Sequence, residues 1–224
     1  MKGRLFSDEE LKEMGVPTAD AIVKAIDAGD LDRAKRLVGR MQRESLSMHD
    51  LFLHWVTALL SFIGRRYGDE VLYEAFKEGC GAWLKPLVQV YETAPPRRRA
   101  QLMAAGLRGH LQPIAVEEDE EKVTFLMQPC GSGGRLVLGN SYGPPSNYLK
   151  VKKPQAMTYG RQDLPVYCCH CSFQEILPIE VSGNPLFVTE PSQNLGHEPC
   201  RISIYKDPGS VPDKFYKRVG KARG

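Results

Sequence analysis

Hydrophobic side chains in residues 1–112 recur every three or four positions, the spacing that places them on one face of a helix. The repeat is clearest over 31–41 and 51–62. We expect a short first helix after Ser7, followed by helices over about 19–28, 31–41, 47–64, 70–92 and 96–109. The pattern therefore predicts a helical bundle of about five or six helices in this half of the chain.

Polar residues and glycine mark where these helices begin and end. Ser7 is followed three residues later by Glu10, the spacing of a capping box at a helix N-terminus. Asp30 and Ser47 each precede an apolar repeat, and Gly29 follows the expected second helix. We therefore expect separate helices to begin after Asp30 and after Ser47.

Residues 113–224 have the composition of short strands joined by turns and loops. They contain 12 of the 16 prolines, and proline interrupts helices and central strands alike. Strands are expected over about 123–127, 165–167, 186–189 and 201–205, with a turn at the acidic run 117–121 and a long ordered loop over 139–165. The chain is therefore predicted to be α+β, with a helical N-terminal bundle over 1–112 packed on a small, loop-rich α/β part over 113–224.

Charge and hydropathy narrow the range of partners. The chain has 30 Lys and Arg against 27 Asp and Glu, a net charge of +3, and the charge is evenly spread, which argues against a dedicated nucleic-acid binder. Its best apolar stretch, Val56 to Gly64, is shorter than a membrane span, and the N-terminus lacks the apolar core of a signal peptide. We expect a cytoplasmic protein that binds neither nucleic acid nor membrane. Its expected partner is a small-molecule ligand or substrate, and the chain could form a homodimer.

Six cysteines carry the strongest chemical signal, and five of them lie after residue 129. Cys168 and Cys171 form a CxxC pair, whose spacing lets two thiolates bind one metal ion. The other ligands must come from distant segments, and Cys130 and Cys200, each preceded by proline, are the natural candidates. We predict a metal site, most simply zinc, held by Cys130, Cys168, Cys171 and Cys200. Four protein ligands would make it structural, and three would leave a position for water or substrate.

The segment Cys130-Gly131-Ser132-Gly133-Gly134-Arg135 is the second signal. Glycine lets a backbone come close to a ligand, and successive N–H groups can bind an anion. Gly133 and Gly134 with Arg135 are therefore predicted to bind the anionic end of a substrate. The alternatives are a plain glycine turn, or a turn that activates Cys130 as a nucleophile.

His170 and Glu190 are the candidates for proton transfer. His170 lies inside the cysteine cluster, where it can ligate a metal or act as a general base. His49 and His54 are five residues apart, which does not place them on one helical face, so a shared metal is not expected.

Two segments near the C-terminus resemble a known family. Residues 183–190 (GNPLFVTE) and 196–202 (GHEPCRI) resemble the end of V4R (4-vinyl reductase-like) domains, which include small-molecule sensors with a bound zinc. The resemblance implies one early ligand from the 168–171 cluster, Glu190 as the acidic ligand and Cys200 as the last cysteine. Ser192 stands where the family has its other late cysteine, and Cys130 could replace it. A similar ending occurs in the aminothiazoline-carboxylate hydrolase family, which implies hydrolysis of C–N or C–S bonds.

Three hypotheses follow from these signals. The first is a zinc-dependent hydrolase or lyase that acts on a small organic anion, with His170 or Glu190 moving the proton. The second is a zinc-stapled, small-molecule-binding module similar to V4R sensors, without catalysis. The third is a metal-free thiol enzyme with Cys130 as its nucleophile. Coordination separates the first two, because a closed shell of four protein ligands favours the binding module.

Overall fold

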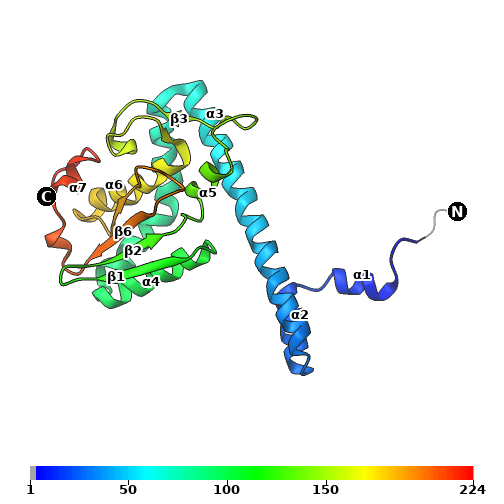
Figure 1. The fold of residues 1–224 in the computed structure, drawn as a ribbon. Helices are drawn as coiled ribbons and strands as arrows, with labels where there is room; N and C mark the ends of the chain where they lie inside the picture. The colour runs from blue at the N-terminus through cyan, green and yellow to red at the C-terminus, as the bar shows by residue number, and fades with distance from the viewer. Residues whose placement is uncertain (1–3, 224) are drawn as a thin grey trace. The chain divides into compact units, whose positions relative to one another are not determined.

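The computed structural model describes residues 4–223, which form two compact units (Figure 1). The first unit ends at Leu51 and the second begins at Phe52. The protein combines helices with a small antiparallel sheet, which confirms the predicted α+β class. The predicted boundary at 112 marks the change from helices to strands, but it lies inside the second unit.

The first unit is helical. It contains α1 (Asp8–Met14), α2 (Thr18–Asp27) and the beginning of α3 (Leu31–Thr93). The predicted capping box at Ser7 is confirmed, since its side chain accepts a hydrogen bond from the Glu10 backbone while the Glu10 carboxylate accepts one from the Ser7 backbone. Asp30 also caps α3 as expected, through a 3.0 Å bond from the Arg33 N–H. Ala25, Ala34 and Leu37 form the small apolar core of this unit.

Helix α3 differs from the prediction of separate helices. Ser47 lies within α3, so the expected helices over 31–41 and 47–64 are one helix, and the prediction of a bundle is wrong here. The helix is interrupted at Gly68, whose φ of 85° and ψ of −178° are accessible to glycine almost alone. The sequence predicted a second helix start here because Ser47 has the residue type of an N-cap, but Ser47 lies inside the helix.

One stretch of α3 is long and apolar enough to cross a membrane by length and composition. This corrects the expectation that no such stretch exists. Several of its large apolar side chains are exposed, including Trp55 and Phe62. A helix of a soluble protein or a signal sequence passes the same test, so the cytoplasmic location stays a prediction.

The second unit is built on a four-stranded antiparallel sheet in the order β1-β2-β6-β5. The strands are β1 (Ile114–Glu118), β2 (Lys122–Met127), β5 (Val188–Glu190) and β6 (Cys200–Tyr205). Strands β2, β5 and β6 match the predicted ones, whereas β1 takes in part of the acidic run that was expected to be a turn. Its exposed face explains the miss, since four of its five residues are solvent-exposed.

Short helices and a second strand pair complete this unit. The helices are α4 (Pro96–Gly109), α5 (Gly133–Leu138), α6 (His170–Ser182) and α7 (Asp213–Lys217), with single turns η1 (Ala156–Thr158), η2 (Val166–Cys169) and η3 (Pro208–Ser210). Strand β3 (Lys150–Val151) pairs with β4 (Leu164–Pro165) inside the predicted long loop. Helix α6 was not predicted, because it is buried on several faces and carries Pro178, so it lacks a clear apolar stripe.

Two apolar cores hold the second unit together. In one, α6 packs on α3, with the rings of Phe173 and Phe76 stacked 5.1 Å apart. In the other, α4 and the end of α3 pack on the sheet, where Met103 and Tyr91 meet Phe125 and its neighbours. Figure 1 shows α4 alongside β1 and β2. The helices after Gly68 therefore belong with the strands, which is why the unit boundary lies far before residue 112.

Candidate functional site

Strand pairing brings two distant cysteines close together. Cys200 is the first residue of β6 and pairs with Met127 near the end of β2. Cys130 follows β2 three residues later, and both residues contact the same apolar core. The antiparallel register therefore explains how Cys130 and Cys200 approach each other across 70 positions of sequence.

The CxxC pair joins them from another element. Cys168 lies in η2 and Cys171 in the first turn of α6. Burial raises the pKa of the Cys168 thiol, and the charges of Cys130, Cys169 and Cys200 raise it further. Burial likewise raises the pKa of Cys171, followed by the charges of Cys168, Cys130 and Cys200. The four predicted metal-binding cysteines therefore lie in one region of the second unit, where their charges affect one another.

The glycines of the CGSGGR segment are explained by these sulfurs. A Cβ added to Gly133 would lie 2.7 Å from Cys168 Sγ, and one added to Gly134 would lie 3.0 Å from Cys130 Cβ. Both glycines are buried, at the start of α5. Their absence of side chains therefore makes room for the cysteines, and the predicted role in binding a substrate anion stays a prediction. Arg135, in the same helix, is partly buried.

The remaining two cysteines, Cys169 and Cys80, are buried in the apolar core. Cys169 is fully buried in the apolar core, and its thiol faces the Pro165 carbonyl at 3.8 Å. Cys80 is buried on α3, where desolvation raises the pKa of its thiol to about 12. The predicted ligand set includes neither of them.

Two neighbouring residues, Ser192 and Arg161, lower the pKa of the cysteine thiols. The Ser192 N–H donates to Cys200 Sγ over 3.4 Å, and this bond lowers the pKa of Cys200 against the larger effect of burial. Arg161 donates to the carbonyls of Pro191 and Ser192 at 3.2 and 2.8 Å. Its charge lowers the pKa of both Cys168 and Cys200. The cation near the cysteines is thus Arg161, which sequence reasoning missed because no local motif marks it.

The structure does not itself show a metal site at these cysteines. Zinc binds sulfur at about 2.3 Å in a tetrahedron, so its four sulfurs lie within about 4 Å of one another. Over residues 4–223, no three His, Cys, Asp or Glu side chains are placed to hold a metal ion together. The zinc site with Cys130, Cys168, Cys171 and Cys200 as ligands therefore stays a prediction.

His170 connects the cysteines to an apolar pocket. Its Nδ1 lies 2.5 Å from the Tyr167 carbonyl, which only accepts, so Nδ1 carries the hydrogen. Its Nε2 lies 3.6 Å from Cys171 Sγ. Burial lowers the pKa of His170 and keeps the ring neutral near pH 7. The orientation is fixed by Tyr167, whose ring also packs against that of His170 at 4.6 Å.

The pocket has a volume of about 410 Å³ and lies within the second unit. Its walls are largely apolar and come from α3 and α6, with Phe76 and Trp83 among them. His110, Tyr167 and His170 supply polar groups. His110 is held by Ser132, whose Oγ lies 2.9 Å from its Nδ1. An apolar cavity with a few oriented polar groups is typical of a small-molecule site.

The structure distinguishes two carboxylates, the fully buried Glu175 and the partly exposed Glu190. Glu190 ends β5 opposite Arg201 of β6 and is partly exposed. Glu175 is fully buried in α6, and its charge contributes to the raised pKa of Cys171. The predicted proton-transfer role of Glu190 therefore gains no support from its surroundings.

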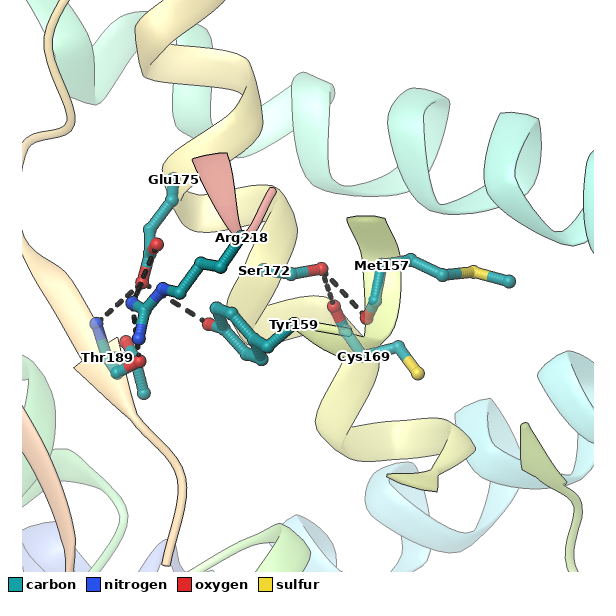
Figure 2. Close-up of polar contacts among 7 residues, drawn as sticks. All are labelled: Met157, Tyr159, Cys169, Ser172, Glu175, Thr189 and Arg218. Carbon is teal, nitrogen blue, oxygen red and sulfur yellow. Dashed lines mark hydrogen bonds and ion pairs between the residues drawn. The ribbon is translucent and has the colours of Figure 1, made fainter. Parts of the chain in front are cut away.

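Figure 2 shows what Glu175 binds. The Arg218 guanidinium donates to its two oxygens at 2.7 and 2.9 Å, and the Thr189 N–H donates to Oε1 at 2.6 Å. Arg218 also lies over the rings of Tyr159 and Phe215, at 4.6 and 4.5 Å. This buried ion pair fastens the C-terminal segment to α6 and β5.

Comparisons with family models, with curated proteins and with solved structures give no significant match. The resemblance of residues 183–202 to V4R and aminothiazoline-carboxylate hydrolase domains therefore stays a prediction.

Proposed function

We propose that the second unit is a small-molecule-binding module with a metal–thiolate centre held by Cys130, Cys168, Cys171 and Cys200. The observation that carries this proposal is the convergence of four cysteines from three separate segments, while Cys169, between two of them, is directed into the core. Thiolates are strong ligands for soft and borderline metals. No three of these side chains surround one ion in the described structure. If all four bound a metal they would complete its coordination shell, which favours a structural centre over an open catalytic one.

A ligand site beside the centre supports the binding role. The apolar pocket shares His170 with the cysteine group, since this ring lines the pocket and approaches Cys171. The pocket's volume of about 410 Å³ suits a compact ligand with an aromatic or aliphatic body. We therefore propose that the metal centre fixes the turn carrying His170, and that the ligand binds between that turn and α3.

Metal analysis tests the centre. Protein purified without an affinity metal column should carry bound metal, and Cys200→Ala should lose most of it. The matched control is Cys169→Ala, which removes the neighbouring thiol that faces the Pro165 carbonyl and should keep the metal. Equal metal content in both variants, or no metal in the wild type, would contradict the proposal.

Filling the pocket tests the ligand site. Gly79 lines the pocket, and a Cβ there would meet nothing within 4 Å. Gly79→Leu should therefore weaken binding of the aromatic anion anilinonaphthalene sulfonate about tenfold, or about 1.4 kcal/mol, in a fluorescence titration. Gly106→Leu is the control, because Gly106 lies on α4 with equal space. Unchanged affinity in Gly79→Leu would place the ligand elsewhere.

The catalytic hypothesis, a hydrolase or lyase acting on a small organic anion, stays a prediction with one observation in its favour. His170 lines the pocket, and Tyr167 fixes the orientation of its ring through Nδ1, which leaves Nε2 as the nitrogen that can accept a proton. His170→Gln should abolish turnover of a substrate once one is found, while leaving metal content unchanged. Turnover that survives this change would exclude His170 as the base.

A further inference from the structure

Helix α3 carries an apolar face that is open to solvent. The side chains of Phe52, Trp55, Leu59 and Phe62 are 49, 57, 49 and 57% exposed. They follow one another at intervals of three, four and three residues, which places them on one face of the helix. The rings of Phe52 and Trp55 lie 6.0 Å apart, so the patch is continuous there. Contiguous exposed apolar patches mark interaction sites.

The same alternation of intervals begins earlier in the helix and forms a heptad repeat. Eight positions follow it, and seven of them are apolar and exposed; they are Val38, Met41, Ser45, Met48, Phe52, Trp55, Leu59 and Phe62. We call these eight positions the α3 seam. An apolar repeat of 3.5 residues lets one helix pack lengthwise against another, with side chains of each helix inserted between those of the other. The repeat therefore specifies a helix as the partner.

The opposite side of α3 is already occupied by the second unit. Thr57 and Leu60 are buried there, and Ser61 Oγ accepts a hydrogen bond from the Leu149 N–H at 3.0 Å. A helix that spans a bilayer alone faces lipid on all sides, whereas this one is fixed along one side to its own unit. Its apolar composition is therefore better explained by a partner that covers the seam.

Charge favours a protein partner over a membrane surface. No Lys or Arg lies between Arg43 and Arg65, and Asp50 is the one acidic residue in 45–64. Helices that lie on a membrane surface carry Lys and Arg on their polar face, which attract anionic lipids. Aromatic residues and Met without charged neighbours are instead typical of the centre of a protein interface.

The size of the face suits a pair of chains. Leu51 and Val56 flank the α3 seam and are 58 and 42% exposed, and Met48 within it is 54% exposed. Half-exposed side chains of this size offer about 100 Å² each, so the seven large ones over 48–62 present about 700 Å² per chain. A stable specific interface buries about 800 Å² on each partner. A second copy supplies a helix with the same length and repeat, and a two-fold axis places the same patch of both chains together.

We propose that two copies of this chain associate through the α3 seam to form a two-fold symmetric dimer. Pairing removes the exposed apolar side chains of both helices from water, which is the main driving force of such association. The interface uses neither the cysteines nor the lining of a metal centre, so it stands apart from the proposed function.

The test is sedimentation equilibrium of the full chain over a dilution series. We expect a species of twice the chain mass of 25.1 kDa. Trp55→Glu places a charge in the seam of both chains and should raise the dissociation constant about a hundredfold or more. Val181→Glu is the matched control, because Val181 is equally exposed, at 57%, and lies on α6 outside the seam. It should leave the dimer unchanged.

Each other outcome contradicts the proposal. A wild type that sediments as a single chain would overturn it, and flotation of that chain with phosphatidylserine vesicles would assign the face to a lipid surface. If Trp55→Glu fails to fold by circular dichroism, Leu59→Glu takes its place. A dimer that survives the change in the seam, or one that Val181→Glu weakens equally, would place the interface elsewhere.

Discussion

At the scale of single residues, the site is shaped as much by glycines as by cysteines. Gly133 is buried against Cys168, and a methyl group there would overlap the sulfur at 2.7 Å. The glycine-rich segment suggested an anion-binding turn from its sequence. Its buried position shows that small size is needed here for packing, since Gly133 and Gly134 begin α5 directly beside the thiols.

Gly133→Ala should therefore displace Cys168 and weaken the metal centre. We expect the bound metal to fall severalfold and the free energy of unfolding to drop by about 1–3 kcal/mol, the usual cost of overpacking. Gly106→Ala is the matched control, because an added Cβ there meets nothing within 4 Å. Metal analysis and urea denaturation measure both effects. Full metal content in Gly133→Ala would show that Cys168 is not a ligand.

At the scale of elements, the buried Glu175–Arg218 pair joins α6, β5 and the C-terminal segment (Figure 2). Removing both charges from water is costly, and hydrogen bonds from Thr189 and stacking on Tyr159 offset part of that cost. Burial raises the pKa of Glu175 to about 7, in opposition to Arg218 and the hydrogen bonds. The pair therefore makes the attachment of α7 sensitive to pH.

The sign of this dependence follows from linkage. The pKa of Glu175 is higher in the folded state than its ordinary value of 4.5. The folded state therefore binds the proton more tightly, and this stabilisation is complete below pH 4.5 and lost as the pH rises through about 7. The full loss is about 3 kcal/mol.

The amide introduced by Glu175→Gln does not titrate, so this variant should not lose stability through that group as the pH rises. The free energy of unfolding of the wild type, relative to the variant, should fall by up to about 3 kcal/mol as the pH rises from acid to neutral values. Urea denaturation across that range measures it, with Glu78→Gln as an exposed control on α3. A difference between wild type and Glu175→Gln that stays constant with pH would refute the argument.

At the scale of the whole molecule, every residue of the candidate site lies in the second unit. This unit includes the part of α3 that follows Leu51. Leu60 contributes to its core, and Ser61 Oγ accepts a hydrogen bond from the Leu149 N–H at 3.0 Å. The helical residues between Phe52 and Gly68 are therefore needed by the strand-containing half.

A chain of residues 52–224 should fold and carry the same metal content as the full protein. A shorter chain, 69–224, lacks Leu60 and Ser61 and should lose stability or fail to fold. Metal analysis and thermal unfolding of the two chains measure the difference. Equal stability would mean that the 52–68 segment is not part of this unit.

The sequence by itself determined the elements whose signals are local. The Ser7 capping box, the Asp30 cap and strands β2 and β6 follow from neighbouring residues, so they could be predicted. The choice of four cysteines out of six also came from spacing and flanking prolines. Helix α6 was missed because a buried helix has no polar face to reveal its period.

Only the tertiary structure decided how these parts meet. The β2–β6 register brings Cys130 toward Cys200, and α6 adds Cys168 and Cys171 from another direction. The role of Arg161 near the sulfurs and the pairing of Glu175 with Arg218 depend on contacts between residues far apart in the chain. Spacing along a sequence can suggest that thiols share a metal. Whether the thiols come close enough to do so is set by the packing of the elements that carry them, which no local pattern encodes.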